Sequence, residues 1–145
     1  MPGYSGTPLP KKLGIEPGFR VQLVSAPTEV QTELREALAA CTIVRDRKSN
    51  GDAGGKDRES LDFAMVFTKS QADLKREFRR VANLLQPAGM LWASWPKKSS
   101  GVASVLDDNR VREIGLAAGL VDVKVCAITE VWSGLKFVRR VKDRI

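Results

Sequence analysis

Short apolar runs alternate with helix-like spacings along the chain. The run Leu61–Phe67 is almost uninterrupted, which predicts a strand buried on both faces of a sheet. Directly after it, Leu74, Phe78, Val81 and Leu85 recur at intervals of three and four, which predicts a helix that buries one face. In chain order, the spacings predict a helical turn at 10–13, a strand at 20–25, a helix at 27–38, strands at 42–45 and 61–67, a helix at 70–85, a strand at 90–95, a helix at 108–118 and strands at 121–128 and 135–138.

Capping and breaking residues mark the ends of the three longer helices. Thr28 and Gln31 have the spacing of a capping box at the start of the first. Ser70 is placed to cap the second, and Gln86–Gly89 is expected to end it because proline cannot continue a helix. Gly119 is the expected C-terminal stop of the third. Local signals therefore agree with the hydrophobic spacing.

The order of the elements predicts the fold class. Strand–helix–strand alternation, followed by two strands joined by the short linker Thr129–Gly134, predicts an α/β, three-layer, doubly wound Rossmann-like fold. Its sheet is expected to be mostly parallel, with a C-terminal antiparallel hairpin at one edge. A chain of 145 residues suits one core, so residues 1–145 are expected to form a single domain. Within it, residues 1–19 are predicted to form an irregular arm and residues 46–60 a flexible loop.

Histidine is absent from the sequence, and this excludes several kinds of chemistry. Without imidazole there is no Ser-His or Cys-His nucleophile pair and no histidine general base, and most zinc and iron sites lose a ligand. The two cysteines, Cys41 and Cys126, lack the spacing of a metal or redox pair and are expected to be free and buried. No metal site is predicted, and whether the chain is an enzyme stays open.

The chain carries an excess of positive charge. Lys and Arg total 24 and Asp and Glu 17, which gives a net charge of +7. The excess is spread over several elements, so it favours anionic partners in general. Nucleic acid is a weaker expectation, because no recognised module or basic stripe interleaved with aromatics is present. Lys75, Arg76, Arg79 and Arg80 lie opposite the buried stripe of their helix and are expected to form a solvated face. No apolar run reaches the roughly 20 residues of a membrane span, so a soluble, cytoplasmic protein without a membrane partner is expected.

The strongest candidate site is the segment after the 90–95 strand. Ligands of open α/β sheets bind beyond the C-terminal ends of the strands, and Lys97–Gly101 leaves such an end. Two ammonium groups, two hydroxyls and a glycine can hold a phosphate, sulfate or carboxylate through charge-assisted hydrogen bonds, with Trp95 and Trp132 as flat walls. The alternative is a solvated turn. The candidate ligand-binding residues are Lys97, Lys98, Ser99, Ser100, Gly101, Trp95, Thr68, Lys69, Trp132, Ser133, Tyr4, Ser5 and Thr7.

Segments along almost the whole chain resemble a known family. Those at 3–9, 95–101 and 132–138 are similar to a family of small bacterial proteins catalogued as domain of unknown function three-zero-five-two. Lys12–Val21 and Ala118–Val123, with the order of elements, resemble the class I S-adenosylmethionine-dependent methyltransferase fold, of which that family looks like a degenerate relative. The resemblance implies the fold but assigns no activity.

The methyltransferase resemblance implies where a cofactor would bind. In that fold the turn after the first strand is rich in glycine, which lets the backbone approach the cofactor. Here the turn Ser25–Glu29 contains no glycine, and a proline removes one amide donor. The Asn- or Asp-Pro-Pro-aromatic motif of many such enzymes is also absent from Phe67–Ser70. Asp46 lies about where an acidic residue would hold the ribose hydroxyls.

Three functions are therefore open. The first is binding of a small anionic ligand on a degenerate methyltransferase-like scaffold, with no cofactor predicted. The alternative is an S-adenosylmethionine-dependent methyltransferase with an atypical cofactor site that includes Asp46. The third is nucleic-acid binding through the net positive charge.

Overall fold

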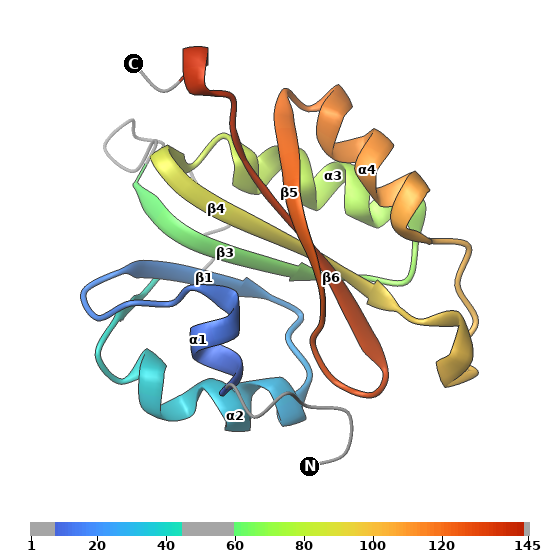
Figure 1. Ribbon diagram of the computed structural model, residues 1–145, viewed down its shortest axis with the longest axis horizontal. Helices are drawn as coiled ribbons and strands as arrows, with labels where there is room; N and C mark the ends of the chain where they lie inside the picture. The colour runs from blue at the N-terminus through green and yellow to red at the C-terminus, as the bar shows by residue number, and fades with distance from the viewer. Residues whose placement is uncertain (1–7, 45–59, 144–145) are drawn as a thin grey trace, which may run out of the picture.

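The computed structural model describes residues 8–44 and 60–143. Its elements, shown in Figure 1, are α1 (Leu9–Leu13), β1 (Arg20–Val24), α2 (Thr28–Leu38), β2 (Thr42–Ile43), β3 (Leu61–Phe67), α3 (Gln71–Ala82), β4 (Leu85–Pro96), η2 (Lys98–Ser100), α4 (Asp108–Ala117), β5 (Leu120–Ala127), β6 (Trp132–Arg139) and η3 (Val141–Asp143). Residues 1–7 of the predicted arm and 46–59 of the predicted loop lie outside the described residues. Across the described ranges, no helix is both long enough and apolar enough to cross a membrane.

The strands form one mixed sheet in the order β2-β1-β3-β4-β6-β5. β2, β1, β3 and β4 are parallel neighbours, and β6 is antiparallel to both β4 and β5. The predicted mostly parallel α/β class with a C-terminal hairpin is therefore confirmed. Within the hairpin, β6 rather than β5 pairs with β4, an order that the sequence analysis left open. β6 thus lies inside the sheet and β5 forms the edge.

Helices cover both faces of this sheet (Figure 1). On one face, Phe78 of α3 packs edge-to-face on Phe137 of β6, with ring centroids 5.0 Å apart, in the hydrophobic core shared with α4. On the other face, Leu34 of α2 belongs to a second core with Trp92 of β4. The indole Nε1 of Trp92 donates to the carbonyl oxygen of Leu13 at 3.0 Å, which fixes α1 to the sheet. The three layers are those that the sequence predicts.

The end of α3 and the start of β4 differ from the prediction. The helix ends at Ala82, and Leu85 begins β4 opposite Leu61 of β3 instead of closing the helix. The ladder then shifts register, and the next paired residue of β4 is Met90. Residues 86–89 therefore lie within β4, where they interrupt its pairing with β3, and they are not the end of a helix as predicted. At Gly89 a Cβ atom would lie 2.6 Å from the carbonyl oxygen of Leu61, so only glycine fits this close backbone approach.

The hairpin linker is shorter than predicted. β6 begins at Trp132, so the assignment of Trp132–Gly134 to the linker is wrong. The hydroxyl of Thr129 accepts hydrogen bonds from the backbone N–H groups of Val131 at 3.1 Å and Trp132 at 3.0 Å. A threonine hydroxyl that bonds its own following backbone closes a turn within few residues, which leaves Trp132 free to enter the strand.

The start of α2 also differs. Thr28 is already the first helical residue, and the N-cap is Pro27, which has no side-chain cap. The predicted capping box is therefore wrong. The amide Nε2 of Gln31 instead donates to the carbonyl oxygen of Ala26 at 2.8 Å, and this bond holds the turn between β1 and α2.

Candidate functional site

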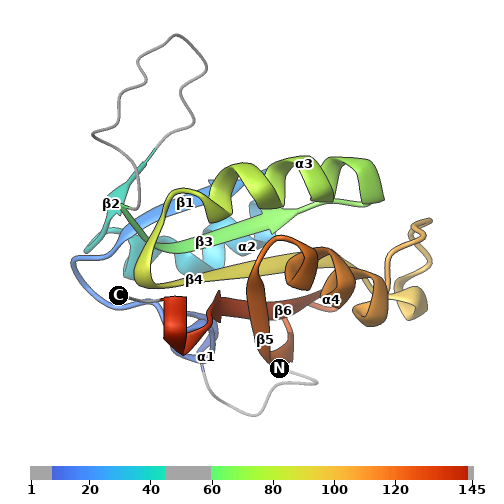
Figure 2. The same ribbon diagram turned by 90° about the horizontal axis from the view of Figure 1, so that it is seen from above.

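The parallel strands β1, β3 and β4 end at one edge of the sheet (Figure 2). β1 leads into Ser25, β3 into Thr68 and Lys69, and β4 into Lys97 and η2. In Figure 2, β3 and β4 end on the right, where the segment with η2 extends away from the sheet. This is the edge at which open α/β sheets bind ligands.

The segment after β4 folds into a closed turn. The backbone N–H of Lys97 donates to the carbonyl oxygen of Val131 at 2.8 Å, which ties the segment to the β5–β6 hairpin. The hydroxyl of Ser100 donates to the carbonyl oxygen of Lys97 at 2.6 Å and accepts from the N–H of Val102 at 3.1 Å. Ser100 therefore stabilises the turn, and its hydroxyl is already engaged.

The other side chains of the turn are more accessible. Lys97 is half-buried, whereas Lys98 and Ser99 are exposed. Gly101 ends the turn in the left-handed region, with φ +83°. Two ammonium groups and one hydroxyl are therefore open to a ligand, which is one hydroxyl fewer than the sequence predicts.

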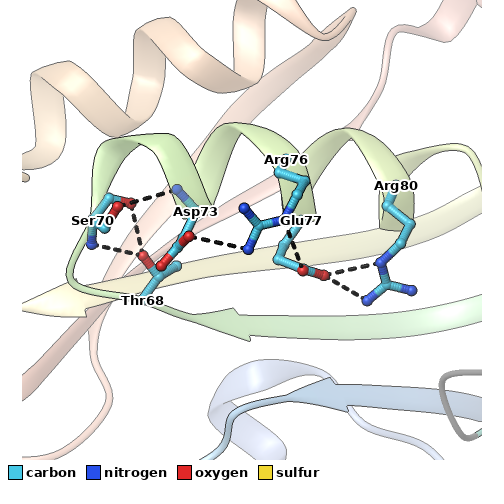
Figure 3. A network of polar contacts seen from close by, with 6 residues as sticks. All are labelled: Thr68, Ser70, Asp73, Arg76, Glu77 and Arg80. Atoms are coloured by element: carbon cyan, nitrogen blue, oxygen red, sulfur yellow. Dashed lines mark hydrogen bonds and ion pairs between the residues drawn. The ribbon is translucent and has the colours of Figure 1, made fainter. Parts of the chain in front are cut away.

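The exit of β3 uses its hydroxyls in the same way (Figure 3). The hydroxyl of Thr68 donates to the carbonyl oxygen of Ser70 at 2.9 Å and accepts from its N–H at 3.0 Å. The hydroxyl of Ser70 accepts from the N–H of Asp73 at 3.2 Å, so Ser70 caps α3 as predicted. Thr68 is buried, and its place in the structure is that of a turn residue beside Lys69.

A long-range hydrogen bond joins the two exits. The hydroxyl of Ser104 donates to the carbonyl oxygen of Lys69 at 3.0 Å and accepts from the N–H of Leu106 at 3.1 Å. The segment after β4 is therefore held against the segment after β3. Within residues 8–44 and 60–143, no carboxylate pairs with Lys69, Lys97 or Lys98.

The two tryptophans do not form two walls of one site. Trp95 is only 5% exposed and belongs to the core under α3 and α4. Trp132 packs in the opposite core, with its ring centroid 5.2 Å from that of Phe67. Ser133 is paired with Trp95 in the ladder and so lies on the same face as Trp95. Trp132 precedes Ser133 in β6, and consecutive strand residues point to opposite faces, so Trp132 lies on the face opposite to Trp95. The prediction that the two tryptophans form two walls of one site is therefore wrong. Tyr4, Ser5, Thr7 and Asp46 lie outside the described residues, and their roles stay predictions.

Two features of this edge could not be predicted from the sequence. Ser25 has φ +59°, the left-handed conformation that side chains other than glycine rarely adopt. Ser94 of β4 is fully buried, and its hydroxyl has no hydrogen-bond partner in the described part of the chain. Both depend on tertiary contacts, which residue spacing does not encode.

The turn after β1 tests the cofactor that the methyltransferase resemblance implies. Ser25 supplies the sharp bend, but Pro27 offers no N–H and Glu29 places a carboxylate in the first turn of α2. A helix N-terminus attracts anions through free N–H groups, and both Pro27 and Glu29 weaken that attraction. The described residues therefore do not fit the chemistry of a glycine-rich cofactor turn, and no reaction step is derived through S-adenosylmethionine.

The basic stripe of α3 is partly neutralised by its own helix (Figure 3). Arg76 Nη2 lies 3.0 Å from Asp73 Oδ1, and Arg80 Nη2 lies 2.7 Å from Glu77 Oε1. Lys75 on the same helix is exposed. Ion pairs at a protein surface contribute about 0–1 kcal/mol, and these two pairs lower the positive potential that a nucleic acid would meet.

Candidate metal and cysteine chemistry adds nothing to this edge. Among the described residues, no three Cys, Asp or Glu side chains come together as metal ligands. Cys126 is buried and free, as predicted, whereas Cys41 is free but only half-buried.

Comparisons with known proteins give a family and a fold. A family described as “Protein of unknown function (DUF3052)” matches residues 10–141. Among curated proteins, none matches the chain. A structure of a SAM dependent methyltransferase from Aquifex aeolicus is similar to this chain with a TM-score of 0.62 and 14% identity, over 88% of this chain and 85% of that one. The CcbJ methyltransferase from Streptomyces caelestis is similar with a TM-score of 0.53 and 11% identity, over 92% and 87%. A putative methyltransferase from Thermoplasma acidophilum is similar with a TM-score of 0.55 and 9% identity, over 93% and 75%. At such identities the likeness shows the fold alone.

Proposed function

Because the chain belongs to DUF3052, a family described as proteins of unknown function, its activity has to be argued from its own residues, and we propose that it binds a small anionic molecule at the exits of β3 and β4. The binding groups are the ammonium groups of Lys97 and Lys98, with Lys69 from the neighbouring exit and the hydroxyl of Ser99. The scaffold is that of a methyltransferase, and the proposed role is binding without methyl transfer.

One observation carries the proposal. Lys69, Lys97 and Lys98 come from two segments that the Ser104–Lys69 hydrogen bond holds together, and none of the three has a described carboxylate partner. Three cations at the ligand-binding edge of an α/β sheet raise the local concentration of anions and offer charge-assisted hydrogen bonds. A solvated turn needs no such convergence of two segments.

The hydroxyl groups that already form hydrogen bonds limit which side chains can bind such a ligand. Thr68 and Ser100 already bond the backbone of their own turns, so recognition depends on the lysines and on Ser99. Lysine is a compact point charge with three donors, which suits a tetrahedral oxyanion better than a planar group. Small phosphorylated molecules are therefore the favoured ligands, ahead of carboxylates.

Thermal unfolding with a panel of anions tests the proposal. The panel is sodium phosphate, pyrophosphate, citrate and adenosine monophosphate, all at constant ionic strength against sodium chloride. A ligand at about 100 times its Kd stabilises the folded state by about 2.7 kcal/mol, which at this chain length is a rise in Tm of about 5–10 °C. Lys97→Glu combined with Lys98→Glu is expected to remove the part of the rise that comes from binding at the exits of β3 and β4.

The matched control is Lys75→Glu with Arg79→Glu on α3, which changes the net charge by the same amount elsewhere on the surface. This control is expected to keep the full rise in Tm. Equal loss in both double variants would show a general charge effect and would reject the site. A panel in which no anion raises Tm above the chloride reference would reject the function.

A second candidate, an S-adenosylmethionine-dependent methyltransferase, is supported by one observation. Ser25 holds a left-handed conformation directly after β1, so the sharp bend of the methyltransferase turn is kept although the glycine is not. Asp46 is its proposed ribose ligand. Calorimetry with S-adenosylhomocysteine tests this candidate: heat of binding that Asp46→Ala removes would support it, and no heat would retire it.

A further inference from the structure

Two lysines face one another directly across the C-terminal hairpin. Lys124 of β5 is paired with Lys136 of β6 in the antiparallel ladder. Lys136 is in turn paired with Trp92 of β4, whose indole bonds the carbonyl oxygen of Leu13 in α1. Paired residues of neighbouring strands point to the same face. Both lysine side chains therefore lie on the face that carries α1.

A third lysine joins them from α1. The ammonium group of Lys124 donates to the carbonyl oxygen of Lys12 at 3.4 Å, and that of Lys12 donates to the carbonyl oxygen of Ala127 at 3.3 Å. The three elements α1, β5 and β6 thus bring Lys12, Lys124 and Lys136 to one part of the sheet, and we call these three residues the lysine cluster. Backbone carbonyls accept from two of them but carry no full negative charge.

No carboxylate balances the pair at its centre. In the part of the chain that the structure describes, neither Lys124 nor Lys136 forms an ion pair. The nearest acidic residue along β5 is Asp122, which bonds Nε of Arg112 at 3.0 Å on the α4 side of the sheet. Like charges directly opposite each other across two strands destabilise a sheet. The arrangement therefore costs folding stability that an aliphatic or acidic residue would not cost.

The electrostatics of Lys136 reflect this imbalance. Partial burial, and then repulsion by Lys124, lower the pKa of Lys136 below its ordinary value. A lysine perturbed by desolvation together with a like charge is a functional-site candidate. Here the perturbation accompanies a geometric observation, the cross-strand pair itself.

We propose that the lysine cluster is a second binding site, which takes a phosphoryl dianion bridging Lys124 and Lys136, with Lys12 at its border. A dianion placed between the two ammonium groups replaces one repulsion by two attractions. Each ammonium group has three donors, and the oxygens of a tetrahedral phosphoryl group accept from several directions. A monoanionic carboxylate would leave one of the two positive charges unbalanced.

This site is separate from the one proposed at the exits of β3 and β4. Lys136 is level with Trp92, and Lys97 lies five positions further along the chain, after the end of β4. Five residues of extended strand span about 16 Å, which is too far for one phosphoryl group to touch both. The inference therefore does not rest on the proposed function.

Lysine-resolved NMR tests the proposal. The side-chain signals of Lys124 and Lys136 are followed from about pH 7 to about pH 11, across the ordinary range of lysine, in sodium phosphate and in sodium chloride of equal ionic strength. Phosphate is expected to raise the pKa of Lys136 and to shift the signals of both lysines in a saturable way. In Lys124→Gln, the pKa of Lys136 is expected to rise in chloride already, and the response to phosphate is expected to be lost.

Controls separate this site from the other one and from folding defects. Lys97→Glu with Lys98→Glu is expected to keep the phosphate response of Lys136, because the exits of β3 and β4 are remote. Backbone amide spectra check that each variant is folded. A pKa of Lys136 that is the same in phosphate and in chloride would overturn the proposal, as would a response to phosphate that Lys124→Gln does not reduce. Saturable binding of a single-stranded oligonucleotide, without any response to phosphate, would also overturn it, because the site would then read a nucleic-acid chain.

Discussion

Replacing Gly115 with alanine is expected to destabilise the protein, although alanine favours a helix. Gly115 lies in α4 and is buried against Phe137 of β6. A Cβ atom at this position would lie 2.0 Å from Cε2 of Phe137 and 2.5 Å from Cζ. Carbon atoms in contact lie about 3.5–4.0 Å apart, so the helix and the ring would have to separate by about 1.5 Å. The ring cannot turn away freely, because Phe78 packs edge-to-face on it.

The magnitude follows from two opposing terms. Overpacking a core costs about 1–3 kcal/mol, and the upper end applies here because Phe137 is held in a strand that is paired on both sides. Alanine gains about 1 kcal/mol over glycine in a helix interior. The expected net loss in the free energy of unfolding is about 1–2 kcal/mol, which is a decrease in Tm of about 3–8 °C.

Urea denaturation of the Gly115→Ala variant measures this loss. The pair Glu113→Ala and Glu113→Gly, at an exposed position of the same helix, measures the propensity term alone. Phe137→Leu in the Gly115→Ala background makes room for the methyl group, so a double-mutant cycle is expected to give a favourable coupling of about 1 kcal/mol or more. A Gly115→Ala variant more stable than the wild type, by the amount that the Glu113 pair gives, would refute the close packing of α4 on β6.

Three further substitutions test local features. Ser25→Gly is expected to raise the free energy of unfolding by about 0.5–1 kcal/mol in urea denaturation. The left-handed conformation costs residues other than glycine about 1–2 kcal/mol, and the greater freedom of glycine in the unfolded state offsets about 0.4–1 kcal/mol of that gain. A lower free energy of unfolding in this variant would contradict the strain at Ser25. Trp92→Phe removes the donor to the carbonyl oxygen of Leu13 and is expected to cost about 1–3 kcal/mol in the same assay, whereas an unchanged midpoint would show that the bond contributes nothing. Lys124→Glu is expected to stabilise the protein by about 1 kcal/mol. In the wild type, the free energy of unfolding is expected to rise as the pH increases through the lowered pKa of Lys136, because the folded state loses the Lys136 proton at a lower pH than the unfolded state does. In Lys124→Glu this rise is expected to be smaller. A series of denaturation curves over pH in which the rise is the same in both proteins would contradict the repulsion between Lys124 and Lys136.

Hydrophobic spacing predicted the elements whose stability comes from burial. The strand at 61–67 and the helix at 108–117 lie where the sequence places them, because their apolar residues fill the two cores. The errors fall where a long-range contact decides. Leu85 continues a helical spacing, yet it pairs with Leu61 in the sheet. Local spacing also left open which strand of the hairpin pairs with β4, and the structure places β6 there and β5 at the edge.

The sequence predicted the position of the candidate site but not the hydrogen bonds within it. Residue types and strand ends placed Lys69 and Lys97 at one edge, since parallel strands end together. The sequence did not show that Thr68 and Ser100 bond their own turns, because a hydroxyl beside a lysine looks the same whether or not the backbone uses it. Strand alternation, applied across the end of β4, would have placed Trp95 in the core.

The distribution of ion pairs separates discrete ligand binding from a general attraction to polyanions. Several arginines of the chain are matched, as Arg76 is by Asp73 and Arg112 is by Asp122. Among the described residues, Lys69, Lys97 and Lys98 at the exits of β3 and β4, and the cross-strand pair Lys124 and Lys136, have no carboxylate partner. A protein that held nucleic acid through its net charge of +7 would lose affinity by a similar amount for any two charge reversals, with a steep dependence on salt. A protein with two oxyanion sites would respond at each site only to the loss of that site's own lysines. Two double variants, Lys97→Glu with Lys98→Glu and Lys75→Glu with Arg79→Glu, and the single variant Lys124→Gln therefore give different patterns under the two descriptions. An oligonucleotide affinity that falls equally in the two double variants would favour the net charge over the site at the exits of β3 and β4.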